Sequence, residues 1–434
     1  ADMRKEGSAY DLTLTIGILV ASGQINAEDV DKYIIMGELS LDGSLQPIRG
    51  ALPIAIKAKE EGFKGFFLPK QNVKEAAIVA GLDVYGIENV QEVIDFLEGK
   101  GTLEPTTIDT RAEFYKTLDF PEFDFSDVKG QESIKRCMEI AAAGGHNIIL
   151  IGPPGAGKTM LAKRLPSILP PMTLREALET TKIHSVAGKL KEVGLMNQRP
   201  FRSPHHTISN VALVGGGSYP QPGEISMAHN GVLFLDELPE FTRQVLETLR
   251  QPLETGSVMV ARANNHVTYP CRFMLISAAN PCRCGYLADA ERACARVPIC
   301  GQDYLGKISG PLMDRFDLRI EVPPVSMTDL TLPDDGDTSQ TIAARVATAR
   351  QIQRARFAEH PDLRQNADAE GAQLEEIATP ESEGAELLNK AADKFKLSAR
   401  GYHRILRVAR TIADLAGSET VQKPHIAEAI SYRL

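Results

Sequence analysis

The sequence predicts an α/β fold, with a parallel sheet in the middle of the chain, a smaller α/β region before it and a helical region after it. Three short apolar runs in the middle each end in glycines or polar residues, as the buried strands of open parallel sheets do. They occupy residues 146–151, 231–235 and 273–279. Residues 341–357 and 398–415 carry helical periodicity instead.

The first strand leads into a glycine turn typical of phosphate-binding loops. It reads Gly-Pro-Pro-Gly-Ala-Gly-Lys-Thr at residues 152–159, and a helix is expected to start at Lys158. Backbone N–H groups of such a loop converge on phosphates, Lys158 would reach the β- and γ-phosphates of ATP, and the Thr159 hydroxyl would hold Mg²⁺. A structural glycine loop is the alternative. The predicted nucleotide-binding residues are Gly152, Pro153, Pro154, Gly155, Ala156, Gly157, Lys158, Thr159 and Met160.

Two carboxylates, Asp236 and Glu237, follow the second strand. Acidic side chains at the carboxyl end of a buried strand are costly unless they bind a ligand. We expect Asp236 to hold Mg²⁺, largely through water, and Glu237 to polarise the attacking water. The alternative is the acidic first turn of a helix, since Leu-Pro follows. The pair favours ATP hydrolysis.

Three further polar residues are candidates for the same reaction. Asn280 ends the third strand and could orient the lytic water, as sensor-1 residues do in AAA+ motors. Arg315 stands where chelatase and replicative-helicase AAA+ proteins carry an arginine finger, which neutralises γ-phosphate charge on the adjacent subunit and so implies a ring. A surface salt bridge is its alternative. Arg400 resembles sensor 2 by position, with Arg404 as the competing choice.

Four motifs together resemble one family closely. They are Arg-Ser-Pro-His-His-Thr at 202–207, Pro-Gly-Glu-Ile-Ser at 222–226, Leu-Asp-Glu-Leu-Pro-Glu-Phe at 235–241 and Ala-Asn-Pro-Cys at 279–282. They look like the magnesium-chelatase-like AAA+ proteins of the YifB/ComM type, over nearly the whole chain. The resemblance implies an AAA+ P-loop domain with a C-terminal helical lid, a homo-hexamer, and a DNA helicase that drives branch migration during natural transformation. Single-stranded and branched DNA would pass through the ring pore. Without this resemblance, the residues predict only an ATPase that forms a ring.

Composition predicts a soluble, cytoplasmic, multidomain protein with no membrane partner. The chain has 434 residues and a net charge of −9, and no apolar stretch approaches the length of a membrane span. Nucleic-acid binding would therefore need a local basic stripe, such as a ring pore. The chain begins without an initiator Met, and the first domain of the family starts well upstream, so we expect residues to be missing before it.

Changes in composition predict five parts. They are a first α/β domain at 1–100, a polar linker at 101–120, the P-loop ATPase core with its insertions at 121–325, an acidic linker at 326–339 and the helical lid at 340–434.

The first part resembles a partial catalytic domain of Lon proteases (S5 domain 2-like), through residues 37–48 and 67–72. A Lon-type enzyme needs a serine nucleophile and a lysine base. Aligned here, Ala9 stands at the nucleophile position, or Ser8 after a shift of one residue, and Leu52 stands at the base position. We therefore expect a proteolytically inactive scaffold, with a DNA-facing collar as its candidate role.

Four of the six cysteines cluster after the third strand: Cys282, Cys284, Cys294 and Cys300, spaced C-x-C-x9-C-x5-C. Tetrahedral zinc would suit such a loop, which otherwise lacks a core, and would join the third strand to the arginine-finger segment. The family often has another cysteine where this chain has Arg296, which could partly balance the charge of the site. Reduced thiols are the alternative, and structural disulfides are not expected inside cells.

Two insertions of the core are candidate DNA contacts. One spans about 184–230 and the other is a predicted hairpin at 257–269, whose alternating residues flank an Asn-Asn turn. Basic residues there could grip phosphates, although a solvated surface charge is the alternative for each. The first insertion contains Lys189, Lys191, Arg199, Arg202, His205 and His206. The predicted DNA-binding residues are Lys189, Lys191, Arg202 and Arg262.

Three other functions stay open. A metal-chelatase motor subunit would share the core and both insertions, but is not expected to carry a Lon-like first domain. An ATP-dependent protease would need the missing serine–lysine dyad. A pure DNA-binding scaffold would not need Asp236, Glu237 and Arg315 together.

Overall fold

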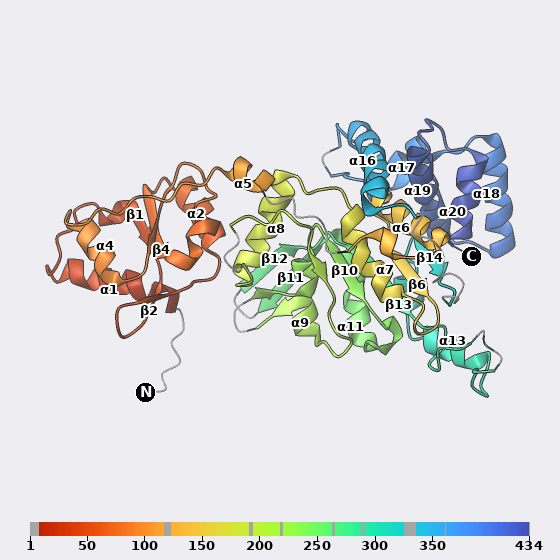
Figure 1. Ribbon diagram of the computed structural model, residues 1–434, viewed down its shortest axis with the longest axis horizontal. Helices are drawn as coiled ribbons and strands as arrows, with labels where there is room; N and C mark the ends of the chain where they lie inside the picture. The colour runs from red at the N-terminus through yellow and green to blue at the C-terminus, as the bar shows by residue number, and fades with distance from the viewer. Residues whose placement is uncertain are drawn as a thin grey trace. The chain divides into compact units, whose positions relative to one another are not determined.

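The computed structural model forms two compact units (Figure 1). The first unit comprises residues 1–119 and 172–198, and the second comprises residues 120–171 and 199–434. The structure describes residues 8–116, 123–190, 194–217, 220–262, 265–287, 289, 291–324, 336–360 and 362–433.

The first unit is built on a three-stranded parallel sheet in the order β1-β4-β5. The strands are β1 (Tyr33–Ile35), β4 (Gly65–Pro69) and β5 (Asp83–Ile87). All residues of the central strand β4 are buried, as expected for a strand covered on both faces. The other elements are α1 (Asp11–Ala21), β2 (Glu38–Leu39), β3 (Leu45–Gln46), α2 (Ala51–Glu60), α3 (Val73–Ala76), α4 (Val90–Leu97), α5 (Thr110–Lys116) and α8 (Leu174–Val186).

Helix α2 packs on two sides, so its apolar residues form no single stripe. Ala55 and Ala58 belong to the core cluster of the sheet. Leu52 instead joins a second cluster with Met172 and Leu195, where α2 lies against α8. Burial on both sides ties the segment that carries α8 to the first unit.

Two boundaries differ from the predicted ones. Residues 172–198 belong to the first unit, whereas the sequence predicts one continuous ATPase core over 121–325. Within 101–120, predicted as a linker, helix α5 forms, and the Thr110 hydroxyl donates to the Ile78 carbonyl at 2.9 Å. Both the placement of residues 172–198 and the position of α5 depend on side-chain contacts between segments that are distant in the sequence.

The second unit contains a five-stranded parallel sheet in the order β14-β6-β13-β10-β7. Its central strands are wholly apolar or small, because helices cover both faces. The strands are β6 (Ile148–Ile151), β7 (Phe201–Arg202), β10 (Val232–Leu235), β13 (Met274–Ala279) and β14 (Leu318–Glu321).

The three predicted strands are confirmed as β6, β10 and β13, which lie side by side. Ile148 pairs with Ile276, and Val232 pairs with Met274. Because all run parallel, their carboxyl ends meet at one edge of the sheet. That edge is where open α/β sheets bind ligands.

The C-terminal helices share their core with this sheet. Buried residues of α16 and α19 pack against α6 beside β6, and both helices lie close to the ranges that periodicity predicts. The predicted linker at 326–339 lies mostly outside the described residues. Helices and short strands of the second unit are α6 (Glu132–Gly144), α7 (Lys158–Arg164), α9 (Asn210–Val214), β8 (Gly215–Gly216), β9 (Gln221–Pro222), α10 (Glu224–Met227), α11 (Arg243–Thr248), α12 (Arg250–Thr255), α13 (Ile299–Leu305), α14 (Gly310–Met313), α16 (Ser339–Arg356), α17 (Gly371–Ala378), α18 (Ser382–Phe395), α19 (Ala399–Leu415) and α20 (Lys423–Ser431).

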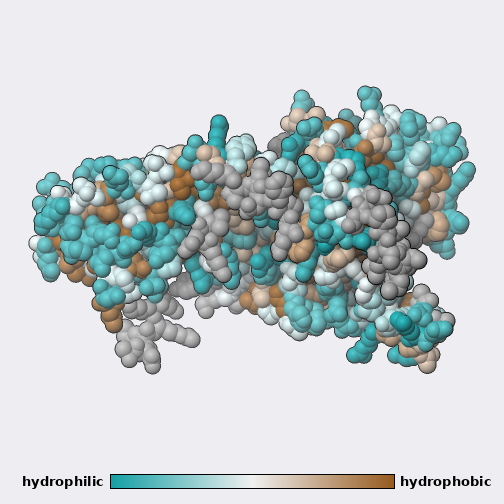
Figure 2. Space-filling model, viewed as in Figure 1, coloured by the Kyte–Doolittle hydropathy of each residue, from teal (hydrophilic) through white to brown (hydrophobic). Residues whose placement is uncertain are grey.

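The predicted hairpin is confirmed as the antiparallel pair β11 (Ser257–Arg262) and β12 (Asn265–Pro270). Its turn residues lie outside the described part of the chain. Hydrophilic and hydrophobic residues are interspersed on the face drawn in Figure 2. Across the described ranges, no helix combines the length and apolar character needed to cross a bilayer.

Candidate active site

The predicted phosphate loop lies between β6 and α7, at the carboxyl edge of the sheet. Gly155 and Gly157 have φ values of +79° and +82°, which side chains rarely adopt, so glycine is required at both. A Cβ atom on Gly152 would lie 2.3 Å from the Val322 carbonyl oxygen, which excludes any larger residue there. Helix α7 begins at Lys158, as predicted, and directs its N-terminal N–H groups at the loop.

Lys158 joins the phosphate loop to the end of β13. Its Nζ atom donates to the carbonyls of Gly152 (2.6 Å) and Pro153 (2.8 Å) and to Oδ1 of Asn280 (3.2 Å). Burial lowers the pKa of Lys158, while the charges of Asp236 and Glu237 oppose that shift. The predicted sensor-1 residue therefore lies beside the lysine predicted to bind phosphate.

Thr159 and Asp236 bring two oxygen ligands together from different elements. The Thr159 hydroxyl donates to Oδ2 of Asp236 at 2.6 Å, although the residues are far apart in the chain. A hydroxyl and a carboxylate beside a phosphate loop suit a hard cation such as Mg²⁺. Oδ1 of Asp236 accepts the Glu237 N–H at 2.9 Å, which fixes the turn after β10.

Glu237 has a strained backbone and an accessible side chain. Its φ is +51°, a value that costs a non-glycine residue about 1 kcal/mol or more. The side chain is 54% exposed, so water can reach the carboxylate. Strain of this kind collects at functional sites, which fits the predicted role in activating water.

His206 is a site residue that the sequence reasoning placed elsewhere, among the candidate DNA contacts. Its Nδ1 atom lies 3.6 Å from Oε2 of Glu237. The ring centroid lies 6.4 Å from that of Phe241 and 4.1 Å from that of His205, whose ring is tilted by 34°. Only the pairing of the short edge strand β7 with β10 brings His206 to Glu237, and a two-residue strand leaves little sequence signal.

Arg202 makes an internal ion pair rather than offering a free charge. Its guanidinium donates twice to Glu224, at 2.6 and 2.7 Å. Bidentate pairs of this type are among the stronger surface interactions, and Glu224 raises the pKa of Arg202 against the effect of burial. Arg202 is thus paired with a carboxylate within the chain, and its contact with DNA phosphates stays a prediction. Arg202 and Glu224 also line a pocket of about 450 Å³, together with residues that include Ser203, Pro204, His205 and Ile208.

The other predicted DNA contacts are distributed over different parts of the chain. Lys189 is exposed and belongs to the first unit. Lys191 and the side chain of Arg262 lie outside the described residues. Arg199 donates to the carbonyls of Pro170 and Asn230 at 2.6 and 2.7 Å. The predicted insertion at 184–230 is thus divided between the two units.

Arg315 lies at the start of the segment that leads into β14. Its guanidinium pairs with Glu254 of α12 at 2.9 Å, and its side chain is 12% exposed. The Nε atom is buried and has no hydrogen-bond partner among the described residues. The Glu254 side chain is 59% exposed, so the pair borders solvent. The arginine-finger role stays a prediction.

Arg404 of α19 links the C-terminal helices to the segment that precedes β14. It donates to Asp317 and to the Arg315 carbonyl, and Asp317 also lies 3.0 Å from His146 Nδ1. Burial would raise the pKa of Asp317, but Arg404 and His146 outweigh it and hold that pKa far below its usual value. Arg400, in contrast, is exposed, so it stays the candidate for sensor 2.

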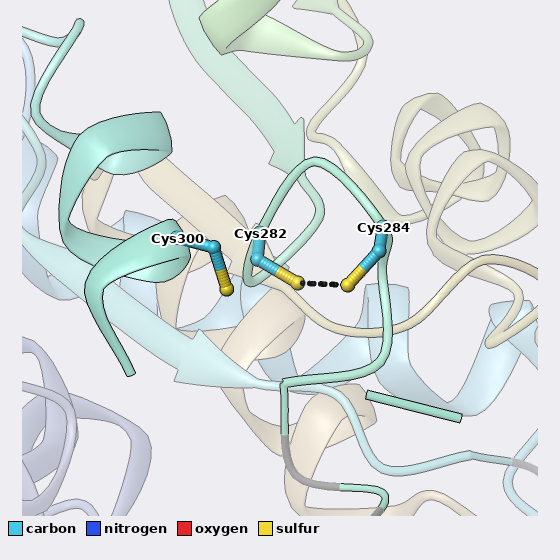
Figure 3. A group of neighbouring side chains, drawn as sticks. All are labelled: Cys282, Cys284 and Cys300. Atoms are coloured by element: carbon cyan, nitrogen blue, oxygen red, sulfur yellow. Dashed lines mark hydrogen bonds between the residues drawn. The ribbon is translucent and has the colours of Figure 1, made fainter. Parts of the chain in front are cut away.

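Three cysteine sulfurs converge beside this edge of the sheet. Cys282 and Cys284 lie on the loop after β13, with sulfurs 3.0 Å apart, and Cys300 comes from α13 (Figure 3). All three sulfurs lie within 4.8 Å of one another. A hydrogen bond from Cys282, assisted by backbone N–H groups, lowers the pKa of Cys284 to about 6. This group could bind a thiophilic ion such as zinc.

In the first unit, the positions aligned with a Lon dyad carry no amine. The Ser8 hydroxyl donates to Oε2 of Glu38 at 3.0 Å. Leu52 is fully buried in the cluster beneath α8.

Comparison with known proteins gives three family matches along the chain. They are subunit ChlI of Mg-chelatase over residues 1–72, magnesium chelatase subunit ChlI over residues 124–330, and the C-terminal part of that subunit over residues 336–433. The second and third cover the sheet with its phosphate loop and the C-terminal helices.

Several individual proteins are similar over the whole chain. Competence protein ComM of Haemophilus influenzae is 42% identical over 434 residues, which is 100% of this chain and 84% of that protein. YifB of Escherichia coli is 43% identical over 439 residues, covering 100% of this chain and 83% of YifB. The magnesium-chelatase 38 kDa subunit of Cereibacter sphaeroides is 24% identical over 344 residues, covering 72% of this chain and 92% of the subunit.

Proposed function

We propose, because this chain belongs to the YifB/ComM family of magnesium-chelatase-like ATPases, that it is an ATP-driven DNA motor working as a homo-hexameric ring. Its task would be branch migration of recombination intermediates during natural transformation. The observation that carries this proposal is the similarity to Competence protein ComM along the entire chain, at 42% identity.

The chemistry of the motor would be hydrolysis of ATP with Mg²⁺. Lys158 would bind the β- and γ-phosphates, and Thr159 with Asp236 would hold the ion, which neutralises phosphate charge. Glu237 would activate the lytic water and Asn280 would orient it. The contacts of Lys158 with Asn280 and of Thr159 with Asp236 support this assignment, since they bring separate elements to one point.

Ring formation would let Arg315 act on the ATP of a neighbouring subunit. In the single chain this guanidinium pairs with the exposed carboxylate of Glu254. The exposed end of this pair is the Glu254 carboxylate, which water can solvate when the pair separates. Exchange of Glu254 for a γ-phosphate would therefore cost little, and the phosphate carries more charge. Arg400 would complete the site as sensor 2.

DNA would run through the ring pore, with the β11–β12 hairpin as the contact from the second unit and Lys189 as an exposed cation of the first unit. We assign the first unit as an inactive Lon-like scaffold. The contact of Ser8 with Glu38 and the buried Leu52 support the absence of a serine–lysine dyad at these positions.

A metal-chelatase motor subunit is the second candidate. Its support is the naming of the matched families after magnesium chelatase and the 24% identity to the 38 kDa subunit. A protease role is disfavoured, because the aligned positions lack an amine.

DNA-stimulated ATP hydrolysis separates these candidates. A DNA motor should turn over ATP faster when single-stranded or branched DNA is added, and should form hexamers with ATP. Lys158→Ala should abolish turnover. Lys163→Ala is the matched control, since Lys163 lies on the same helix but is exposed. ATP turnover that is the same with and without every form of DNA would favour a metal-chelatase motor subunit.

A further inference from the structure

We propose that Cys282, Cys284, Cys294 and Cys300 bind one structural zinc ion, and that the loop held by this ion braces the phosphate loop. The proposal concerns the integrity of the ATP site, and it is independent of what the ATPase acts on.

The ligand set assembles from two elements. Cys282 and Cys284 lie on the loop after β13, and Cys300 lies on α13, with all three sulfurs within 4.8 Å of one another (Figure 3). Cys294 is outside this group of three, but it neighbours Cys284 and Cys300 closely enough to shift the pKa of both thiols, and we assign it as the fourth ligand. Four thiolates are the ligand set of closed, structural zinc sites.

The surroundings support thiolates at this point. The backbone N–H groups of Tyr286 and Cys294 donate to the Cys284 sulfur. Donors of this kind orient metal ligands and offset their negative charge. Gly285 donates to the Cys282 carbonyl at 3.0 Å, which closes a tight turn between the first pair of ligands. Arg296, expected to balance the charge of the site, instead pairs with Asp303 at 2.6 Å.

The same loop touches the phosphate loop directly. Gly285 has a φ of +85°, and a Cβ atom built on it would lie 2.6 Å from Cδ of Pro154. The backbone next to Cys284 therefore packs onto the phosphate loop with no room for a side chain. On the other side of the cluster, a Cβ on Gly301 would lie 2.9 Å from Leu287, so the start of α13 is packed against the loop as well.

An ion at the four sulfurs would therefore cross-link the loop after β13 to the start of α13. The loop follows Asn280 and abuts Pro154, both of which belong to the ATP site. Without the ion, the loop would lose its cross-link to α13. Its packing against Pro154 would then no longer hold the phosphate loop in place.

Metal analysis of the full chain, purified without added metal, tests the first half. We expect about one equivalent of zinc per chain, as closed structural sites retain their ion. Cys300→Ser and Cys294→Ser should lose most of it. Cys271→Ala is the matched control, because Cys271 is equally buried but lies outside the cluster, and it should keep its zinc.

Wild-type protein gives a second measurement in case the serine variants fail to fold. Stepwise titration with a mercurial reagent should release zinc as the cluster thiols react. Less than about a tenth of an equivalent of zinc, iron with sulfide in its place, or a disulfide between Cys282 and Cys284 would each overturn the proposal.

The brace is tested by nucleotide binding and proteolysis rather than by activity. Gly285→Ala should retain zinc but bind a fluorescent ATP analogue several-fold more weakly, since the new methyl group displaces Pro154. In Cys300→Ser, trypsin should cut faster at Arg283 and Arg292, two arginines of the loop. Unchanged nucleotide affinity in Gly285→Ala would refute the brace while leaving the zinc site standing.

Discussion

The Nδ1 atom of His206, in the segment after the edge strand β7, lies 3.6 Å from Oε2 of Glu237. His206 touches neither the phosphate loop nor the Thr159–Asp236 pair in the described contacts. We infer that it positions Glu237.

Replacing His206 by alanine should therefore lower kcat and leave KM for ATP nearly unchanged. A carboxylate that loses its orientation misplaces the lytic water, and a misplacement of ~1 Å can cost up to about 100-fold in rate. His360→Ala is the control, because the His360 side chain is exposed in the segment after α16. Steady-state kinetics decide: equal losses in both variants, or a change confined to KM, would contradict the positioning role.

Glu237→Gln should bind ATP with normal affinity and hydrolyse it slowly. The amide keeps the size of the side chain but cannot accept the proton of the water, and loss of a general base costs about 10²- to 10⁴-fold. Lys158→Ala should instead lose ATP binding, because its charge is assigned to bind the phosphates. Equilibrium binding combined with single-turnover hydrolysis distinguishes the two, and wild-type turnover in Glu237→Gln would refute the assignment.

Arg315→Ala should lack ATPase activity alone, yet regain part of it when mixed with Lys158→Ala. A mixed ring contains interfaces where an intact Lys158 faces an intact Arg315. Glu254→Gln should stay active, since Glu254 only pairs with Arg315 in the single chain. Demonstrably mixed rings with no recovered turnover would argue against action between subunits.

Asp317→Asn should destabilise the chain by about 3–5 kcal/mol, because it leaves Arg404 without its buried partner. Burial opposes ionisation of Asp317, but Arg404 and His146 hold its folded pKa below the unfolded value of about 3.9. This stabilisation is therefore present above pH ~4 and is lost as pH falls through the folded pKa.

Urea unfolding between pH 4 and 7 checks the cost, and acid titration checks its loss. The exposed Arg400→Ala should change stability by less than about 0.5 kcal/mol but slow hydrolysis. Similar stability of Asp317→Asn and wild type at pH 7 would show that the pair is not structural.

Much of the ATP site could be predicted from the sequence, because its residues follow buried strands directly. Lys158, Asp236 and Asn280 each come within a few residues of an apolar run, and parallel strands end at one edge. His206 could not be placed in this way, since the pairing of β7 with β10 is not visible in a two-residue strand.

The contacts of the two arginines of α19 could not be predicted from the sequence either. Arg400 and Arg404 stand one turn apart on α19, and only the fold shows that Arg404 pairs with the buried Asp317 whereas Arg400 is exposed. Likewise, the apolar residues of α2 form no single stripe in the sequence. The structure gives the reason, because Leu52 packs on the side of α2 that faces α8. Both the ion pair of Arg404 and the packing of Leu52 depend on contacts between distant segments, which local sequence patterns do not reveal.

Displacement of a labelled strand from a three-stranded DNA branch tests the central claim most directly. Wild-type protein should displace the strand with ATP and Mg²⁺, and should not do so when ATP is omitted. Glu237→Gln should bind the same DNA but release the strand at a rate reduced in proportion to its ATP turnover. Displacement at equal rates with and without ATP, or none at all by hexamers that hydrolyse ATP and bind the branch, would contradict the assignment of this chain as an ATP-driven DNA motor.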